Sequence, residues 1–163
     1  MTRFLRHFLL DHFAVRRAFP PLAMAAIKSA IAQGERRHDA ELRFVVEASL
    51  PLGYLVAGKT ARDRAIDAFA QLRVWDTEHN SGVLVYVQLA DRRVEIVADR
   101  GINAKVGDEP WRAICATMQQ AFGARRFEDG AVAGIAAISD LLATHFPAAP
   151  GKANELPDEP VAL

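Results

Sequence analysis

Two short polar segments, 75–81 and 99–103, hold the residues whose types are best suited to chemistry in this sequence. The first precedes an apolar run that predicts a strand, and the second follows the next such run. If the two runs form a hairpin, their outer ends meet at one end of a sheet, where loops of α/β proteins commonly bind ligands. The cleft predicted there consists of Asp76, Glu78, Asn80, Ser81, Gly82, Asp99, Arg100, Gly101 and Asn103.

The turn of this hairpin predicts its register. With a two-residue turn at 91–92, Ala90 faces Arg93, and counting outward places Gly82 opposite Gly101. Glycines at both positions would let the two polar segments approach closely, because glycine has no side chain.

Four carboxylates near this end are candidate metal ligands. They are Asp76, Glu78, Asp99 and Asp108. Oxygen ligands of this kind suit a hard cation such as Ca²⁺ or Mg²⁺. Simpler explanations stand beside this one: Asp76 can end a helix, Asp99 can belong to a turn, and His79 fits a solvated loop better than a zinc site. The sequence therefore predicts no certain cofactor and identifies no catalytic residue.

The common signatures of catalysis and nucleotide binding are missing. The sequence has no Gly-x-Ser-x-Gly elbow, no Gly-x-x-x-x-Gly-Lys loop and no Gly-x-Gly-x-x-Gly motif. Its 20 basic and 20 acidic residues give a formal net charge of zero, which argues against a nucleic-acid binder. The single cysteine, Cys115, lies in an apolar helical stretch, which favours a buried thiol and excludes an intramolecular disulfide.

Residues 1–21 predict an amphipathic N-terminal helix. Its apolar residues at helical spacing are Phe4, Leu5, Phe8, Leu9 and Phe13. This face is typical of a helix that docks on its own domain, and the alternative is a basic helix that lies on a membrane surface. The segment lacks the features of a secretory signal, and no run in the chain approaches the roughly 18 apolar residues of a transmembrane helix.

Residues 22–146 predict the main domain. Alternation predicts a strand at 41–48, and a nearly continuous run of β-branched and aromatic residues predicts one at 82–89. Residues 93–98 return from the turn as a further strand, and helical periodicity surrounds all three. A helical crossover should make the first two strands parallel, and the hairpin should add the third antiparallel. The predicted fold is α/β, a three-layer α/β/α sandwich with a small mixed β-sheet. Residues 147–163 contain several prolines and few apolar residues, which predicts a disordered tail.

The strand Asn80 to Val87 and the segment Asp91 to Ile102 resemble the TPM-domain family. In that family an Asp-Asn-Gly-Val-Leu-type strand precedes an Asp-Arg-x-Val-x-Ile hairpin and a Gly-Leu or Gly-Ile turn. Glu41 at the start of the first strand and the segment Phe127 to Gly130 before the last helix match as well. The resemblance covers about residues 22–146 and implies the same α/β/α sandwich.

The resemblance also implies a range of functions. Members of the family include proteins of photosystem II repair and bacterial proteins of membrane-protein maintenance; some are described as acid phosphatases, and some bind divalent cations in this cleft. Two positions depart from the pattern: Asn80 replaces a common aspartate, and Asn103 replaces a glutamate. Neutral amides in place of carboxylates should weaken cation binding. The resemblance therefore implies a weak Ca²⁺ or Mg²⁺ site at most, in a short branch of the family without a membrane anchor.

These observations leave two classes of function open for the cleft, beside plain membrane-surface association through the N-terminal helix. The first is an accessory or binding module that engages another protein through the cleft and is linked to membrane-protein maintenance or repair. The second is a divalent-metal-dependent, acid-phosphatase-like hydrolase that uses the same cleft. The lost carboxylates favour the first. A cytoplasmic location follows from the missing signal and disulfides, at the membrane periphery if the N-terminal helix lies on lipid.

Overall fold

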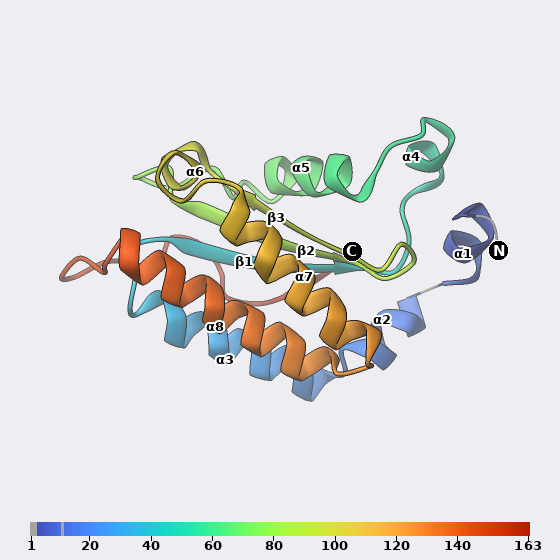
Figure 1. Cartoon of the computed structure of the whole chain (residues 1–163), viewed down its shortest axis with the longest axis horizontal. Coiled ribbons are helices and arrows are strands. Elements are labelled where there is room, and N and C mark those ends of the chain that lie inside the picture. The colour runs from blue at the N-terminus through green and yellow to red at the C-terminus, as the bar shows by residue number, and fades with distance from the viewer. Residues whose placement is uncertain (1–2, 11) are drawn as a thin grey trace.

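The computed structural model describes residues 3–10 and 12–163 (Figure 1). Met1, Thr2 and Asp11, which belong to the predicted N-terminal helix, lie outside this part. The elements are α1 (Arg3–Leu9), α2 (His12–Ala18), α3 (Pro21–Glu35), β1 (Glu41–Glu47), α4 (Leu52–Val56), α5 (Ala61–Gln71), β2 (Gly82–Gln88), β3 (Arg93–Ala98), α6 (Arg100–Val106), α7 (Glu109–Gly123), α8 (Phe127–His145) and β4 (Val161–Ala162). Within the described ranges, no helix is both long and apolar enough to cross a membrane.

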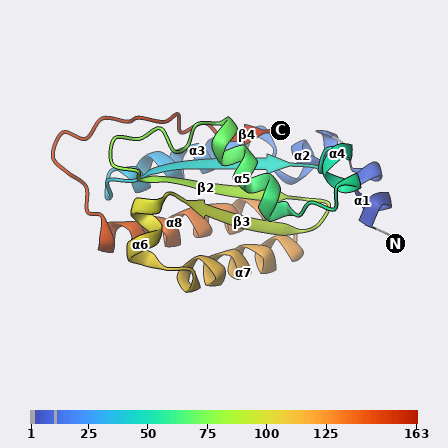
Figure 2. The same ribbon diagram turned by 90° about the horizontal axis from the view of Figure 1, so that it is seen from above.

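A four-stranded mixed sheet with the order β3-β2-β1-β4 forms the middle layer. β1 and β2 are parallel, and β2 and β3 form an antiparallel hairpin, so both predicted pairings are confirmed. β1 and β2 are buried along their whole length, because α3, α7 and α8 cover one face of the sheet and α5 covers the other (Figures 1 and 2). The predicted α/β/α sandwich with a small mixed sheet is therefore confirmed.

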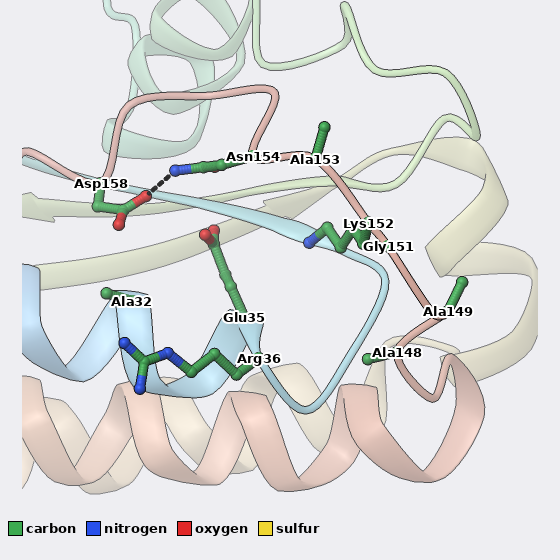
Figure 3. Close-up of a pocket in the computed structure, with 10 residues that line it drawn as sticks. All are labelled: Ala32, Glu35, Arg36, Ala148, Ala149, Gly151, Lys152, Ala153, Asn154 and Asp158. Carbon is green, nitrogen blue, oxygen red and sulfur yellow. Dashed lines mark hydrogen bonds between the residues drawn. The ribbon is translucent and has the colours of Figure 1, made fainter.

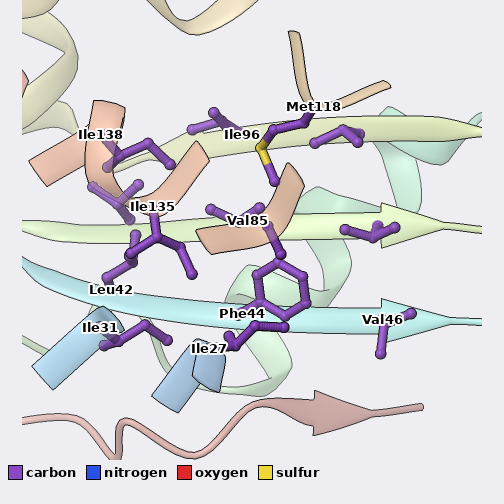
Figure 4. Close-up of a cluster of buried hydrophobic side chains, with 14 of the residues drawn as sticks. Ile27, Ile31, Leu42, Phe44, Val46, Val85, Ile96, Met118, Ile135 and Ile138 are labelled. Carbon is purple, nitrogen blue, oxygen red and sulfur yellow. The ribbon is translucent and has the colours of Figure 1, made fainter. Parts of the chain in front are cut away.

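The main core lies between the sheet and the layer of α3 and α8. Leu42, Phe44 and Val46 alternate along β1 and share this face with Ile27 and Ile135 (Figure 4). The residues between them on β1 contact the other layer, which is smaller. Apolar burial on both faces explains why β2 is a nearly continuous hydrophobic run in the sequence. β1 alternates instead, because it buries the charged residues Glu41, Arg43 and Glu47.

The register predicted for the hairpin is wrong by two residues. Gln88 faces Arg93, so that Gly82 is opposite Asp99 rather than Gly101. The reason is that the connection has four residues, 89–92, instead of two. The first two of these continue the pairing with β1, since the amides of Leu89 and Ala90 each donate to a carbonyl of the 47–48 segment at 3.0 Å.

The N-terminal segment differs from the prediction in two ways. It forms two short helices instead of one, and the apolar face that was predicted to dock is exposed: Phe4 is 53% and Phe8 is 88% exposed. Among residues 3–8 of α1, His7 is buried. Its Nδ1 accepts a hydrogen bond from the Leu50 amide at 2.9 Å, and its Nε2 lies 3.2 Å from Asp91. Polar contacts with residues that are distant in the sequence therefore orient α1.

The tail predicted to be disordered is an ordered part of the domain. β4 pairs in parallel with the outer edge of β1, and the Leu163 amide donates to the Val46 carbonyl at 3.0 Å. The fully buried carboxylate of Glu41 accepts hydrogen bonds from the Leu156 amide at 3.1 Å and the Glu155 amide at 3.3 Å. The tail is ordered because it satisfies this buried charge and an unpaired strand edge, which local composition does not reveal.

Lys152 completes the attachment of the tail and provides a test of it. Its Nζ lies 2.8 Å from the Glu41 carboxylate, whereas Lys28 pairs with Glu159 of the tail at an exposed position. Lys152→Met should destabilise the protein by about 3 kcal/mol, because it leaves a buried carboxylate without its counter-charge. Lys28→Met, the matched control, should leave urea unfolding unchanged, because exposed ion pairs contribute little. Equal effects of the two substitutions would show that the tail is not held through Glu41.

Candidate functional site

The two polar segments lie next to each other at one end of the sheet. The Asp99 amide donates to the Gly82 carbonyl at 2.8 Å. A Cβ atom at Gly101 would lie 2.7 Å from the carbonyl oxygen of Asn80, and one at Gly82 would lie 1.9 Å from that of Val74. Both glycines are therefore required for the close approach of the backbones, and the structure brings Asn80, Gly82, Asp99 and Gly101 together.

Two polar atoms at this end have no hydrogen-bond partner in the described structure. They are the Ser81 hydroxyl and Oδ2 of Asp99, both inaccessible to solvent. The other oxygen of Asp99 accepts from the Arg100 amide at 2.6 Å, at the start of α6. Buried polar atoms usually have partners, so these two are the atoms of the predicted cleft whose hydrogen-bonding capacity is unused.

The remaining residues of the predicted cleft are exposed and separately engaged. Asp76 pairs with Arg73 at 3.4 Å, and the Glu78 amide donates to the Glu155 carboxylate of the tail at 2.8 Å. Asn80 has a φ of 51°, a backbone conformation that asparagine adopts more readily than most residues, so a turn requirement also accounts for its identity. Arg100 and Asn103 are exposed on α6.

The four predicted metal ligands do not share a site. Asp108 pairs with Arg112 of α7 at 3.3 Å, Asp99 binds the first amide of α6, and Asp76 is occupied by Arg73. Over residues 3–10 and 12–163, no three His, Cys, Asp or Glu side chains come close enough together to hold a metal ion. His79, which lies 3.3 Å from Asp39, is exposed in its loop.

A groove of about 380 Å³ runs along the free edge of β3 and includes two of the predicted residues, Asn103 and Asp108. α5 and α7 form its walls. The polar side chains that α5, β3 and α7 contribute to it are Arg62, Arg93, Glu95, Trp111, Arg112 and Gln119. The sequence did not reveal this groove, because it depends on β3 being the outermost strand.

The floor of the groove is a strand edge whose hydrogen bonds are made by side chains. Alternate residues of β3 bond to β2, which leaves the peptide groups of Val94, Ile96 and Ala98 directed outward. The Val94 amide donates to Oε1 of Gln119 at 3.1 Å, and the Ile96 carbonyl accepts from the guanidinium of Arg62. These two side chains occupy positions that a further strand would take.

Two other residues of the groove bear on its chemistry. The indole N–H of Trp111 is buried without a hydrogen-bond partner among the described residues. Burial raises the pKa of the Cys115 thiol to about 11, so Cys115 is protonated at neutral pH and unsuited to nucleophilic attack. The groove therefore offers hydrogen-bond donors and acceptors but no activated nucleophile.

A second hollow, of about 430 Å³, lies between α3 and the tail (Figure 3). Glu35 extends into it from α3, and its Oε1 accepts a hydrogen bond from the Leu42 amide at 2.7 Å. Burial, reinforced by nearby Glu41, raises the pKa of Glu35 to about 8. Asn154 and Asp158 of the tail are joined by a 2.8 Å hydrogen bond on the opposite side. Sequence reasoning missed this hollow, since the tail that closes it was predicted to be disordered.

Comparisons with known proteins agree with this architecture. The chain matches the TPM domain over residues 18–141. It is similar to the NMR structure of the BA42 protein from the psychrophilic bacterium Bizionia argentinensis, with a TM-score of 0.77 and 30% identity over 87% of this chain and 93% of that one. The N-terminal domain of a protein from P. gingivalis shares the fold, with a TM-score of 0.63, 19% identity and 80% of each chain covered. No curated protein matches the chain.

The fold is thus that of an α/β/α protein with a small mixed sheet, and its match covers most of the chain. The protein belongs to the TPM-domain family, as the resemblance of the hairpin indicated.

The raised pKa of Glu35 predicts a specific pH dependence. The folded protein keeps this proton up to a pH of about 8, whereas an unfolded glutamate loses it near 4.5. The free energy of unfolding attributable to Glu35 should therefore fall as the pH rises between these values. Glu35→Gln retains the acceptor for the Leu42 amide and removes the titration.

Between pH 5 and pH 8 the free energy of unfolding of Glu35→Gln should rise by about 3 kcal/mol relative to that of the wild type, because only the wild type loses stability over this range. Urea unfolding measures this difference. Glu109→Gln, which changes an exposed glutamate, serves as the control and should track the wild type. A constant difference between Glu35→Gln and the wild type across this range would contradict the assignment.

Proposed function

We propose that this protein is an accessory binding module that holds an extended segment of another protein along the free edge of β3. The observation that carries the proposal is that Gln119 and Arg62 make, with the Val94 amide and the Ile96 carbonyl, the hydrogen bonds of an absent neighbouring strand. Strand addition to an exposed sheet edge is a common mode of peptide recognition, because backbone hydrogen bonds supply affinity for any extended chain.

The two edges of the sheet are covered differently, and this difference supports β3 as the edge that binds a partner. The tail of the chain itself closes the edge of β1, whereas in the part of the chain that the structure describes only side chains occupy the edge of β3. Side chains can rotate away when a strand binds, and the hydrogen bonds they give up are replaced by those of the ligand. The groove continues past Ala98 toward Asn103 and Asp108, so that a bound segment would end beside the start of α7.

The charges of the groove favour an acidic segment. Three arginines, Arg62, Arg93 and Arg112, line it against two carboxylates, Glu95 and Asp108. The buried indole N–H of Trp111 adds a donor without a partner of its own. Carboxylates of a partner accept hydrogen bonds from such donors, and arginine binds them in a bidentate manner. Membrane-protein maintenance, which the family resemblance implies, is the setting in which we place such a partner.

The alternative, a metal-dependent phosphatase, receives less support from the geometry. Its carboxylates Asp76, Asp99 and Asp108 each have a separate partner, and Asn80 and Asn103 supply neutral amides. A hydrolase of this type needs several carboxylates around one or two cations. We therefore retain only weak cation binding as part of the proposal.

The strand-addition proposal predicts opposite effects for two substitutions in the groove. Peptides selected from a random display library on the whole protein should be acidic and should shift the amide NMR signals of β3. Gln119→Ala should raise their affinity, because it frees the Val94 amide, and Ala98→Pro should lower it about fivefold by removing an outward N–H. Gln120→Ala, an exposed neighbour on α7, is the matched control.

Selected peptides that perturb signals elsewhere, or a weaker affinity after Gln119→Ala, would contradict strand addition. In the second case Gln119 would be a ligand contact rather than a replacement for a strand.

Metal dependence separates the module from the hydrolase. Titration with Ca²⁺ and Mg²⁺, followed by backbone NMR, should show affinity on the order of millimolar or weaker, as in the loosest calcium sites. Asn80→Asp combined with Asn103→Glu should strengthen binding if these positions face a common cation. Micromolar affinity in the unmodified protein, or metal-dependent phosphate release that Asp99→Ala abolishes, would favour the enzyme.

A further inference from the structure

Exposed apolar side chains gather at the end of the molecule formed by α1 and α4. In the described part of the chain, nine large apolar residues are exposed, and five of them belong to these two short helices. They are Phe4, Leu5 and Phe8 of α1 and Leu52 and Val56 of α4. The two helices lie at the same end in both views (Figures 1 and 2). A groove of about 480 Å³ between them is lined by four of these residues and by His7, Leu50 and Leu55.

The polar contacts of α1 explain why its apolar side faces away from the domain. Arg3 pairs with Asp91 at 3.0 Å and donates to the Lys59 carbonyl at 2.8 Å. His7 is buried between Leu50 and Asp91. Because this polar side is anchored, Phe8 remains 88% exposed, which is costly in water unless something covers it.

The charge around this apolar end is positive, although the whole chain is neutral. Residues 3–21 and Asp91, which pairs with Arg3, together contain four arginines and two acidic residues, Asp11 and Asp91, for a formal charge of +2. Arg16 and Arg17 are exposed on α2, next to α1. Exposed aromatic and aliphatic side chains flanked by arginine are the composition of segments that lie in the interface of an anionic membrane.

We propose that this end, formed by α1, α4 and the arginines of α2, binds the surface of an anionic phospholipid bilayer. Phe4, Phe8 and Leu52 enter the boundary between headgroups and acyl chains, and Arg16 and Arg17 contact lipid phosphates. A second copy of the chain fits less well, because an isologous contact through this end would bring the same arginines together. This surface is separate from the β3 groove, so the two proposals stand or fall independently.

The proposal is tested by co-sedimentation of the whole protein with vesicles. Vesicles of mixed phosphatidylglycerol and phosphatidylcholine should bind the protein, and vesicles of phosphatidylcholine alone should bind it more weakly. Phe8→Ser should lower the partition coefficient about tenfold, and added salt should weaken binding because it screens the arginines. Trp75→Ser, an exposed aromatic position at the opposite end of β2, is the matched control for lost apolar surface.

A charge test complements the apolar one. Arg16→Glu with Arg17→Glu should abolish the preference for phosphatidylglycerol, whereas Arg36→Glu, an exposed arginine at the far end of α3, should retain it. Far-ultraviolet circular dichroism and thermal midpoints check that each variant is folded. Two outcomes overturn the proposal. The first is that Phe8→Ser and Trp75→Ser reduce vesicle binding equally. The second is that the protein binds neither kind of vesicle and instead self-associates in a way that Phe8→Ser disrupts.

Discussion

A small sheet has two edges, and the need to satisfy their outward peptide groups organises this molecule. On the β1 side the chain supplies its own strand, β4, and the buried carboxylate of Glu41 fixes the segment that leads to it. On the β3 side no strand is available among the described residues, and Gln119 and Arg62 replace it. Sheet edges left bare invite pairing with other chains, so both arrangements are solutions to one constraint.

The position of α5 allows a side chain to take the place of a strand at the edge of β3. Arg64 of this helix forms a buried ion pair with Glu47 at the end of β1, at 3.0 Å, and Glu47 also accepts a hydrogen bond from Tyr86. This network holds the helix over the sheet, so that Arg62, on the same turn, reaches the Ile96 carbonyl. A polar cluster under one helix thus determines how accessible the edge of β3 is.

The sequence predicted the fold well where the signal was local. β2 was recognisable because burial on both faces leaves a nearly continuous apolar run, and β1 was recognisable from its alternating pattern. The proximity of Asn80 to Asp99 followed from the hairpin. The register was not predictable, since Leu89 and Ala90 are held by β1, which lies far away in the sequence. The predictions for the tail and for the orientation of α1 failed for the same reason. Their partners, Glu41 and Asp91, lie far away in the sequence, and nothing in the neighbouring residues indicates these contacts.

The same dependence extends to the candidate site. The polar end of the sheet could be predicted from residue types and spacing alone, but the β3 groove could not. Trp111 and Gln119 look like ordinary residues of an amphipathic helix until the strand order is known. Their contribution depends on β3 being an outer strand, which is a property of the assembled sheet.

The pairing of Val45 with Val161 also bears on the order of events during folding. These residues lie 116 positions apart (161 − 45), so their contact closes a very long loop. The entropic cost of closing that loop arises before the contacts of β4 can offset it. During synthesis, β1 leaves the ribosome long before its neighbour β4 exists. A nascent chain must therefore pass through a stage in which β1 is a bare strand edge, and this is the stage most vulnerable to aggregation.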